Sequence, residues 1–139
     1  MSLLEQAIAL AVAAHAGQVC RNGCPYILHP LHLMMQMETE TEMMTAVLHD
    51  VVEDTAVTFD DLVALGLPEE VLTAVGLLTH DNDTSYRAYI ATLKPNPLAR
   101  RVKVADLEHN MDIRRLPYVR KKDLKRLRKY HCAWQMLCD

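Results

Sequence analysis

Apolar residues recur every three or four positions along most of the chain, which is the spacing of amphipathic helices. No segment longer than four residues alternates between apolar and polar side chains, so the pattern predicts no β-strand. We therefore predict an all-α fold, a compact bundle of about seven to eight short helices. The expected helices cover approximately residues 3–16, 30–37, 42–53, 58–65, 68–78, 84–94, 97–111 and 120–137.

Capping residues and helix breakers mark several of these boundaries. Ser2 is suited to cap the first helix, and Thr58 with Asp61 has the spacing of a capping box. Residues 17–28 contain two glycines, a proline and several polar side chains, which favour a loop. This loop is expected to deliver His29 to the start of the following helix.

The composition is that of one soluble globular domain spanning residues 1–139. Hydrophobic residues make up 50%, charged residues 24%, and the mean hydropathy is -0.03, which excludes a disordered or fibrous chain. The longest nearly uncharged stretch, Gln6 to Val19, is too short to span a bilayer, and no signal peptide is expected. The four cysteines lack the spacing of a metal knuckle. We expect reduced thiols in a cytoplasmic protein.

Charge is distributed unevenly along the chain. Residues 1–99 hold three basic and 13 acidic residues, a net charge of -10, whereas residues 100–139 hold 12 basic and five acidic residues, a net charge of +7. The basic part either complements the acidic body or creates a field that captures a phosphorylated nucleotide. The pI is about 6.1, and no aromatic residues interleave with the basic cluster in a stacking pattern, which argues against a nucleic-acid ligand.

Four ionisable residues interrupt the apolar pattern of residues 42–53 and the positions after it. On a helix, His49 and Glu53 share one face, and Asp50 and Asp54 lie on the adjacent row. The apolar neighbours imply burial, and burying such charges without partners would cost several kcal/mol each. The cluster is therefore either a solvated helix end or a site where cations or a metal balance the carboxylates.

Two further residues favour the metal. His29 lies at a loop-to-helix junction, from which an imidazole can reach a neighbouring helix, and Asp106 lies among apolar residues of a helix that should be buried. Two imidazoles and two carboxylates form a mixed nitrogen and oxygen set that suits manganese, iron, cobalt or zinc. Such a metal would activate water and polarise a phosphoryl oxygen.

The chain resembles the HD superfamily of metal-dependent phosphohydrolases, and within it the hydrolase domain of the stringent-response Rel/SpoT enzymes and their small stand-alone relatives. The resemblance covers about residues 5–115 and has four ordered blocks. These blocks are Ala13-Ala14-His15-Ala16-Gly17-Gln18, Gly23-Cys24-Pro25-Tyr26-Ile27-Leu28-His29-Pro30, Leu48-His49-Asp50-Val51-Val52-Glu53-Asp54-Thr55 and Lys103-Val104-Ala105-Asp106-Leu107-Glu108-His109-Asn110-Met111.

The resemblance implies a reaction, a cofactor and roles for individual residues. The reaction would be hydrolysis of the 3′-pyrophosphate of guanosine tetra- or pentaphosphate, with release of pyrophosphate and GDP or GTP. Glu53 and Asp54 match the acidic pair that orients or deprotonates the attacking water, and as bases they need to stay ionised near a metal, which lowers a carboxylate pKa. The metal, usually manganese, would be bound by His29, His49, Asp50 and Asp106. The expected substrate contacts are Arg21, Tyr86, Lys103 and Asn110.

One position departs from the family pattern. Where the family has an arginine that packs against the guanine base, this chain has Cys20, followed by Arg21. A thiol cannot replace a stacking guanidinium. Two other hypotheses therefore stand beside the guanosine alarmone hydrolase, namely a hydrolase of the same fold acting on another phosphorylated small molecule, and a non-catalytic nucleotide-binding module. Apolar helix faces leave room for a homo-oligomer, and no membrane partner is expected.

Overall fold

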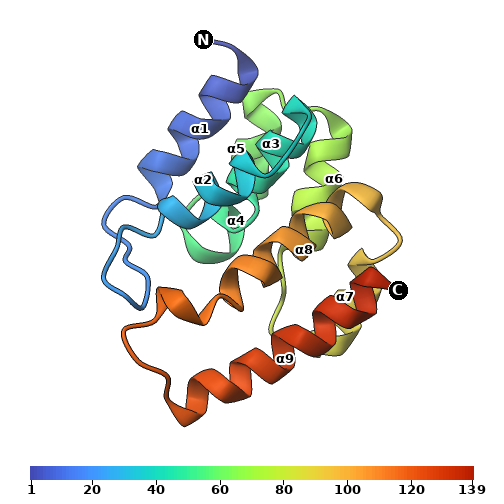
Figure 1. Cartoon of the computed structure of the whole chain (residues 1–139). Coiled ribbons are helices and arrows are strands. Elements are labelled where there is room, and N and C mark those ends of the chain that lie inside the picture. The colour runs from blue at the N-terminus through green and yellow to red at the C-terminus, as the bar shows by residue number, and fades with distance from the viewer.

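The computed structural model describes residues 1–139 and confirms the all-α fold. The only β-type contact is an isolated antiparallel bridge between Val19 and Pro25 in the loop after the first helix. No helix is long and apolar enough to cross a membrane. The elements, shown in Figure 1, are α1 (Leu3–Ala14), α2 (Leu28–Met35), α3 (Glu40–Leu48), α4 (Val51–Asp54), α5 (Phe59–Leu65), α6 (Glu69–Leu78), α7 (Tyr86–Leu93), α8 (Pro97–Asn110), the 3-10 turn η1 (Ile113–Arg115) and α9 (Lys121–Cys138).

Side-chain caps begin several of the helices. Ser2 caps α1 and Thr58 caps α5 through the two reciprocal hydrogen bonds of a capping box, as their spacing predicted. Thr39 caps α3 in the same way, so α3 begins at Glu40 rather than near Glu42. The first backbone N–H groups of a helix have no partner within the helix, and a capping side chain accepts hydrogen bonds from them. These caps therefore set the residues at which α1, α3 and α5 begin.

The helix expected over residues 42–53 is divided in two, which makes nine α-helices where seven to eight were expected. α3 ends at Leu48, and α4 begins at Val51. Between them Asp50 has φ -108° and ψ 1°, outside the helical region. His49 and Asp50 therefore lie at a break between two helices rather than within one regular helix.

The core consists of two groups of buried apolar residues that meet at α3 and α6. One group joins α1, α5 and the start of α4 to these two helices, and the other joins α2, α7, α8 and α9 to them. α3 contacts α1, α2, α6 and α8, so it is the central helix of the bundle. Its C-terminal end, where His49 lies, is consequently deep inside the molecule.

α9 contacts the apolar core of the bundle only over its C-terminal half. It runs beside α8 and reaches α7 (Figure 1). Leu137, near the C-terminal end of α9, is 2% exposed, whereas Leu124, near its start, is 50% exposed. The N-terminal half of α9 extends past the core, and its two leucines, Leu124 and Leu127, are not among the residues packed against it.

A candidate metal centre between two pockets

Three segments bring two imidazoles and two carboxylates together at the centre of the molecule. His29 comes from the first turn of α2, His49 and Asp50 from the break between α3 and α4, and Asp106 from the middle of α8. His29, His49 and Asp106 are at most 4% exposed, and Asp50 is partly buried. These are the four residues that the resemblance implies as metal ligands, and the structure places them side by side.

The ligand-type atoms of these residues face one another. Atoms of His29, His49 and Asp50 lie within 4.8 Å of one another. Asp106 Oδ1 lies 2.8 Å from His29 Nε2 and 3.5 Å from His49 Nε2, and Asp50 Oδ2 lies 3.0 Å from His49 Nε2. Both imidazoles thus direct Nε2 toward the carboxylates, which is the arrangement that a divalent transition metal requires.

The other ring nitrogen of each histidine is already engaged. His49 Nδ1 lies 2.8 Å from the carbonyl oxygen of Ala46, which can only accept, so Nδ1 carries the proton and donates. His29 Nδ1 lies 2.6 Å from His109 Nδ1. In protein metal sites such partners fix the tautomer and leave Nε2 free to bind the ion.

One buried polar atom in the cluster lacks a hydrogen-bond partner. His49 Nε2 is inaccessible to solvent and forms no well-directed hydrogen bond, although two carboxylates are close to it. With Nδ1 donating to Ala46, the neutral form of the ring presents a lone pair to these carboxylates, and lone pairs and carboxylates together need a proton or a metal cation between them. The residues therefore fit a divalent metal ion.

The electrostatics of the cluster also indicate a site that holds positive charge. Burial opposes protonation of His49, but the carboxylates of Asp50 and Asp106 outweigh it and raise the His49 pKa well above its usual value. For Asp106, burial works against ionisation, but the Lys103 ammonium 2.8 Å away and the two histidines hold its pKa well below the usual range. Asp106 is thus an ionised carboxylate in the core.

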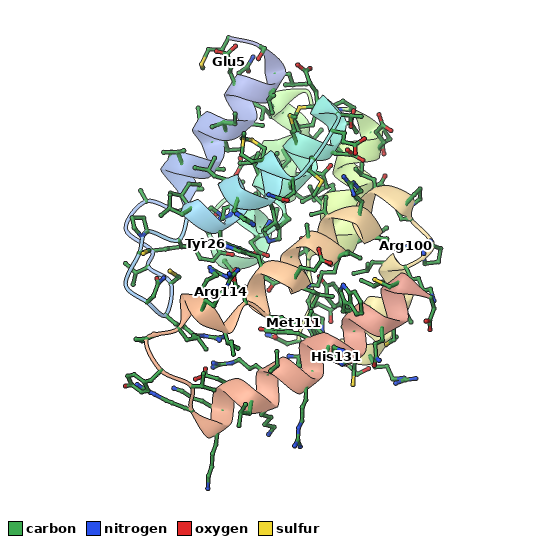
Figure 2. All side chains as sticks on the ribbon, viewed as in Figure 1. Glu5, Tyr26, Arg100, Met111, Arg114 and His131 are labelled. Carbon is green, nitrogen blue, oxygen red and sulfur yellow. The ribbon has the colours of Figure 1, made fainter.

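Tyr26 adds a contact that the sequence analysis did not assign. It lies at the end of the loop before α2, beside α8 (Figure 2), and its hydroxyl donates a hydrogen bond to Asp50 Oδ2. Burial, followed by the charge of Asp50, raises the Tyr26 pKa above its usual value, so the hydroxyl keeps its proton. This hydrogen bond orients the Asp50 carboxylate toward the cluster.

The acidic pair Glu53 and Asp54 lies at the edge of the cluster and is open to solvent. Glu53 Oε1 accepts a hydrogen bond of 2.7 Å from the backbone N–H of His80. Desolvation by the pocket walls raises the pKa of both carboxyl groups, and the charge of Asp50 adds to this effect. The protein's own groups therefore raise the pKa values of Glu53 and Asp54. The lowered pKa values that we expected for bases beside a metal require the charge of a bound cation.

A pocket of about 230 Å³ opens on one side of the cluster, and we call it the inner pocket. It combines the acidic pair with two lysines and three tyrosines. The Tyr86 hydroxyl oxygen is buried without a partner, and burial raises the Tyr86 pKa to about 12, so it is a free hydrogen-bond donor. The lining residues are Asp50, Glu53, Asp54, His80, Tyr86, Tyr89, Lys103, Asp106, Asn110, Lys129 and Tyr130.

A second pocket of about 250 Å³, the loop pocket, lies on the other side of His29 and Asn110. Arg21 and Arg115 give it two positive charges, and Cys20 stands in its wall. The Cys20 thiol donates to Asn22 Oδ1 at 2.6 Å, and all four cysteines are free. The lining residues are Val19, Cys20, Arg21, Asn22, Tyr26, His29, Asn110, Asp112, Arg115 and Leu116.

The four expected substrate contacts fall in these two pockets. Arg21 lines the loop pocket, Tyr86 and Lys103 line the inner pocket, and Asn110 lines both. Lys103 Nζ lies 2.8 Å from Asp106 Oδ2, and Asn110 Nδ2 donates to Asp106 Oδ1 at 3.0 Å. These two side chains therefore also support the carboxylate of Asp106.

Sequence reasoning missed the contributions of the C-terminal part of the chain. Lys129 and Tyr130 of α9 line the inner pocket, and Arg115 of η1 lines the loop pocket. Lys129 Nζ lies 4.1 Å from the centre of the Tyr86 ring. No local pattern distinguishes Lys129 from the other basic residues of α9, because only the docking of that helix against α7 and α8 brings it to the pocket.

Comparison with known proteins gives a consistent set of relatives. A probable GTP pyrophosphokinase of Mycobacterium leprae is 31% identical over 128 residues, covering 80% of this chain and 16% of that protein. The bifunctional (p)ppGpp synthase/hydrolase SpoT of Escherichia coli is 34% identical over 123 residues, covering 78% of this chain and 17% of that protein. The chain thus spans less than a fifth of the length of these relatives. No family model matches it.

The architecture has a counterpart among solved structures. A metazoan ortholog of SpoT, described as hydrolyzing ppGpp and playing a role in starvation responses, matches with a TM-score of 0.77. The match covers 96% of this chain and 84% of that chain at 21% sequence identity, so it establishes the fold. The chain thus shares the all-helical fold of that SpoT ortholog. The homologues are members of the Rel/SpoT (p)ppGpp hydrolase/synthetase family, which confirms the resemblance found in the sequence.

Proposed function

We propose that residues 1–139 form one divalent-metal-dependent phosphohydrolase domain that removes the 3′-pyrophosphate of guanosine tetra- or pentaphosphate, with manganese as the metal. The observation that supports the proposal most directly is the buried cluster of His29, His49, Asp50 and Asp106. In it, Nε2 of both imidazoles faces carboxylates, and Nδ1 of both is engaged elsewhere. The names of the relatives, which include hydrolases of this alarmone, support the choice of substrate.

In this proposal His29, His49, Asp50 and Asp106 hold the metal. When bound, the ion lowers the pKa of a water ligand and polarises a phosphoryl oxygen. Glu53 and Asp54, beside the cluster and open to the inner pocket, orient the attacking water and accept its proton. The backbone N–H of His80 holds Glu53 in place for this role.

The two pockets divide the substrate between them. The inner pocket offers the ammonium groups of Lys103 and Lys129 and the free hydroxyl of Tyr86, which suit the oxygens of a pyrophosphate. The loop pocket offers Arg21 and Arg115 to the rest of the nucleotide. Asn110 belongs to both pockets and lies where the ribose would join the two parts of the substrate.

A second candidate function is hydrolysis of another phosphorylated nucleotide by the same metal centre. The observation in its favour is Cys20 in the wall of the loop pocket, where the family has an arginine that packs against guanine. A thiol offers no planar surface to a base. Selectivity for guanine would then depend on Arg21 and Arg115.

The test is release of pyrophosphate from ppGpp, pppGpp, GTP, dGTP and several 5′-nucleotides by purified protein with manganese, beside a His49→Ala control. We expect pyrophosphate and GDP from ppGpp, with no release by the control or after chelation of the metal. Cleavage of another nucleotide while ppGpp remains intact would favour the second candidate. If the protein binds nucleotides but cleaves none, it is a non-catalytic nucleotide-binding module and both candidates are wrong.

A further inference from the structure

His109 contacts a candidate metal ligand from the side away from the carboxylates. His29 Nε2 lies 2.8 Å from Asp106 Oδ1, and His29 Nδ1, on the other side of the same ring, lies 2.6 Å from His109 Nδ1. The two ring planes are parallel within 4°, and their centroids are 4.9 Å apart. The centroid separation exceeds the distance between the nitrogens by about two ring radii, so the rings meet edge to edge.

The position of the protons follows from this geometry. A hydrogen bond between two imidazole nitrogens needs one N–H and one lone pair. If His29 Nε2 offers its lone pair to a metal, then the ring proton must be on Nδ1, and His109 Nδ1 must accept it. His109 then carries its own proton on Nε2.

We propose that His109 is a positioning residue that accepts the Nδ1–H of His29 and thereby holds His29 in the tautomer and orientation that bind a divalent metal. The proposal rests on the metal-dependent function proposed above. It assigns to His109 the part that the Ala46 carbonyl plays for His49, where Nδ1 also donates to an acceptor outside the cluster. Both candidate imidazole ligands would then be fixed through Nδ1.

One contact packs against the His109 ring, and another holds the His109 backbone. His32, one turn after His29 on α2, stacks face to face on His109 with centroids 3.9 Å apart and planes inclined by 13°. Arg115 donates to the His109 carbonyl oxygen at 2.9 Å and so ties η1 to the end of α8. The His109 ring is hydrogen-bonded to His29 and stacked on His32. Its acceptor nitrogen therefore cannot turn away from His29 without loss of the hydrogen bond and disturbance of the stacking.

The acceptor role can be separated from simple packing by the choice of substitution. His109→Asn places an oxygen acceptor on Cγ, the atom to which Nδ1 of histidine is attached. His109→Leu fills similar space without any acceptor. His109→Gln places its polar atoms one bond further out, near Nε2. His32→Leu keeps an apolar side chain packed against the His109 ring and removes no hydrogen bond to His29, so it is the matched control.

The experiment is calorimetric titration of manganese into the full chain, wild type and the four variants, with a thermal unfolding curve for each metal-free protein. We expect His109→Leu and His109→Gln to weaken manganese binding by about 10- to 100-fold. His109→Asn should restore binding to within a few-fold of wild type, and His32→Leu should change it little. A role in packing alone would lower the melting temperature without this pattern of affinities.

Several outcomes would overturn the proposal. Unchanged manganese affinity in a folded His109→Leu protein would show that His29 needs no acceptor at Nδ1. If His109→Leu does not fold, the comparison of His109→Asn with His109→Gln decides, because equal affinities would contradict a role for an acceptor at Nδ1. If the wild-type chain binds no divalent metal, the proposed function fails first, and this role of His109 fails with it.

Discussion

Asp106 shows how much of the site depends on a single side chain. Its Oδ1 faces His29 and accepts from Asn110, and its Oδ2 faces Lys103. An ionised carboxylate that is 4% exposed would be costly without such partners. Its contacts with Lys103 and Asn110 lie three and four residues away on the same helix, so helical spacing alone could have predicted them.

Glu53 and Asp106 should respond differently to loss of their charge. Glu53→Gln keeps an oxygen that can accept from the His80 N–H, but it removes the base, so turnover should fall by about 100-fold or more while the metal stays bound. Asp106→Ala removes a proposed ligand and should abolish metal binding together with activity. Metal content by elemental analysis, measured beside initial rates, checks both statements.

Either substitution can contradict the assignment of roles. If Glu53→Gln loses metal in the same proportion as activity, Glu53 belongs to the set of metal ligands. Full metal content in Asp106→Ala would remove Asp106 from that set.

Single residues also show the limit of sequence reasoning. The types of His29, His49, Asp50 and Asp106 indicated a metal-binding chemistry, and the structure brings the four together. The hydrogen bond from Tyr26 to Asp50 and the pairing of His29 with His109 join residues 24 and 80 positions apart. Such contacts depend on how α2, α3 and α8 pack, and no local pattern contains that information.

At the scale of elements, helix starts were easier to predict than helix continuity. Ser2 and Thr58 mark starts through short-range hydrogen bonds that depend only on spacing. The break at His49 and Asp50 has no glycine or proline to announce it, and the apolar pattern continues through it. Burial of His49 and the orientation of Asp50 by Tyr26 are tertiary effects, and they accompany the change of backbone direction.

The two ends of α9 should differ in their importance for stability. Leu137 is 2% exposed within the core group that includes α7 and α8, so Leu137→Ala should lower the free energy of unfolding by about 2–3 kcal/mol. Leu124 is 50% exposed, and Leu124→Ala should change it by less than about 0.5 kcal/mol. Urea unfolding of both variants checks this. Equal losses would mean that the N-terminal half of α9 is packed in solution.

The charges of the whole molecule are not arranged for mutual neutralisation. Among the basic residues of 100–139, only Arg101 forms ion pairs with acidic residues of 1–99, at 3.7 Å to Glu38 and 3.5 Å to Glu42. Many long side chains of α9 point away from the rest of the molecule (Figure 2). Of the two interpretations of the charge asymmetry, capture of an anionic ligand agrees better with this arrangement.

Lys129 and Lys125 separate a local phosphate contact from the general field of α9. Both are exposed lysines on this helix, but Lys129 lines the inner pocket and Lys125 lines neither pocket. Replacing either by Met removes one positive charge, so both variants should reduce long-range attraction of the nucleotide by a similar, small amount. Lys129→Met should also lose a charge-assisted hydrogen bond to phosphate, which raises KM for ppGpp by about tenfold, whereas Lys125→Met should change KM by less than about twofold.

Steady-state kinetics at several salt concentrations check this prediction. Salt screens the field of both lysines alike, so KM should rise with salt in wild type and, with similar slopes, in both variants. The higher KM of Lys129→Met relative to Lys125→Met should persist at high salt, because it reflects the lost local contact. Equal KM values for the two variants at every salt concentration would mean that α9 acts only through its net charge. In that case the inner pocket would bind phosphate without Lys129, through groups such as its other lysine, Lys103, and the Tyr86 hydroxyl, which is buried without a partner.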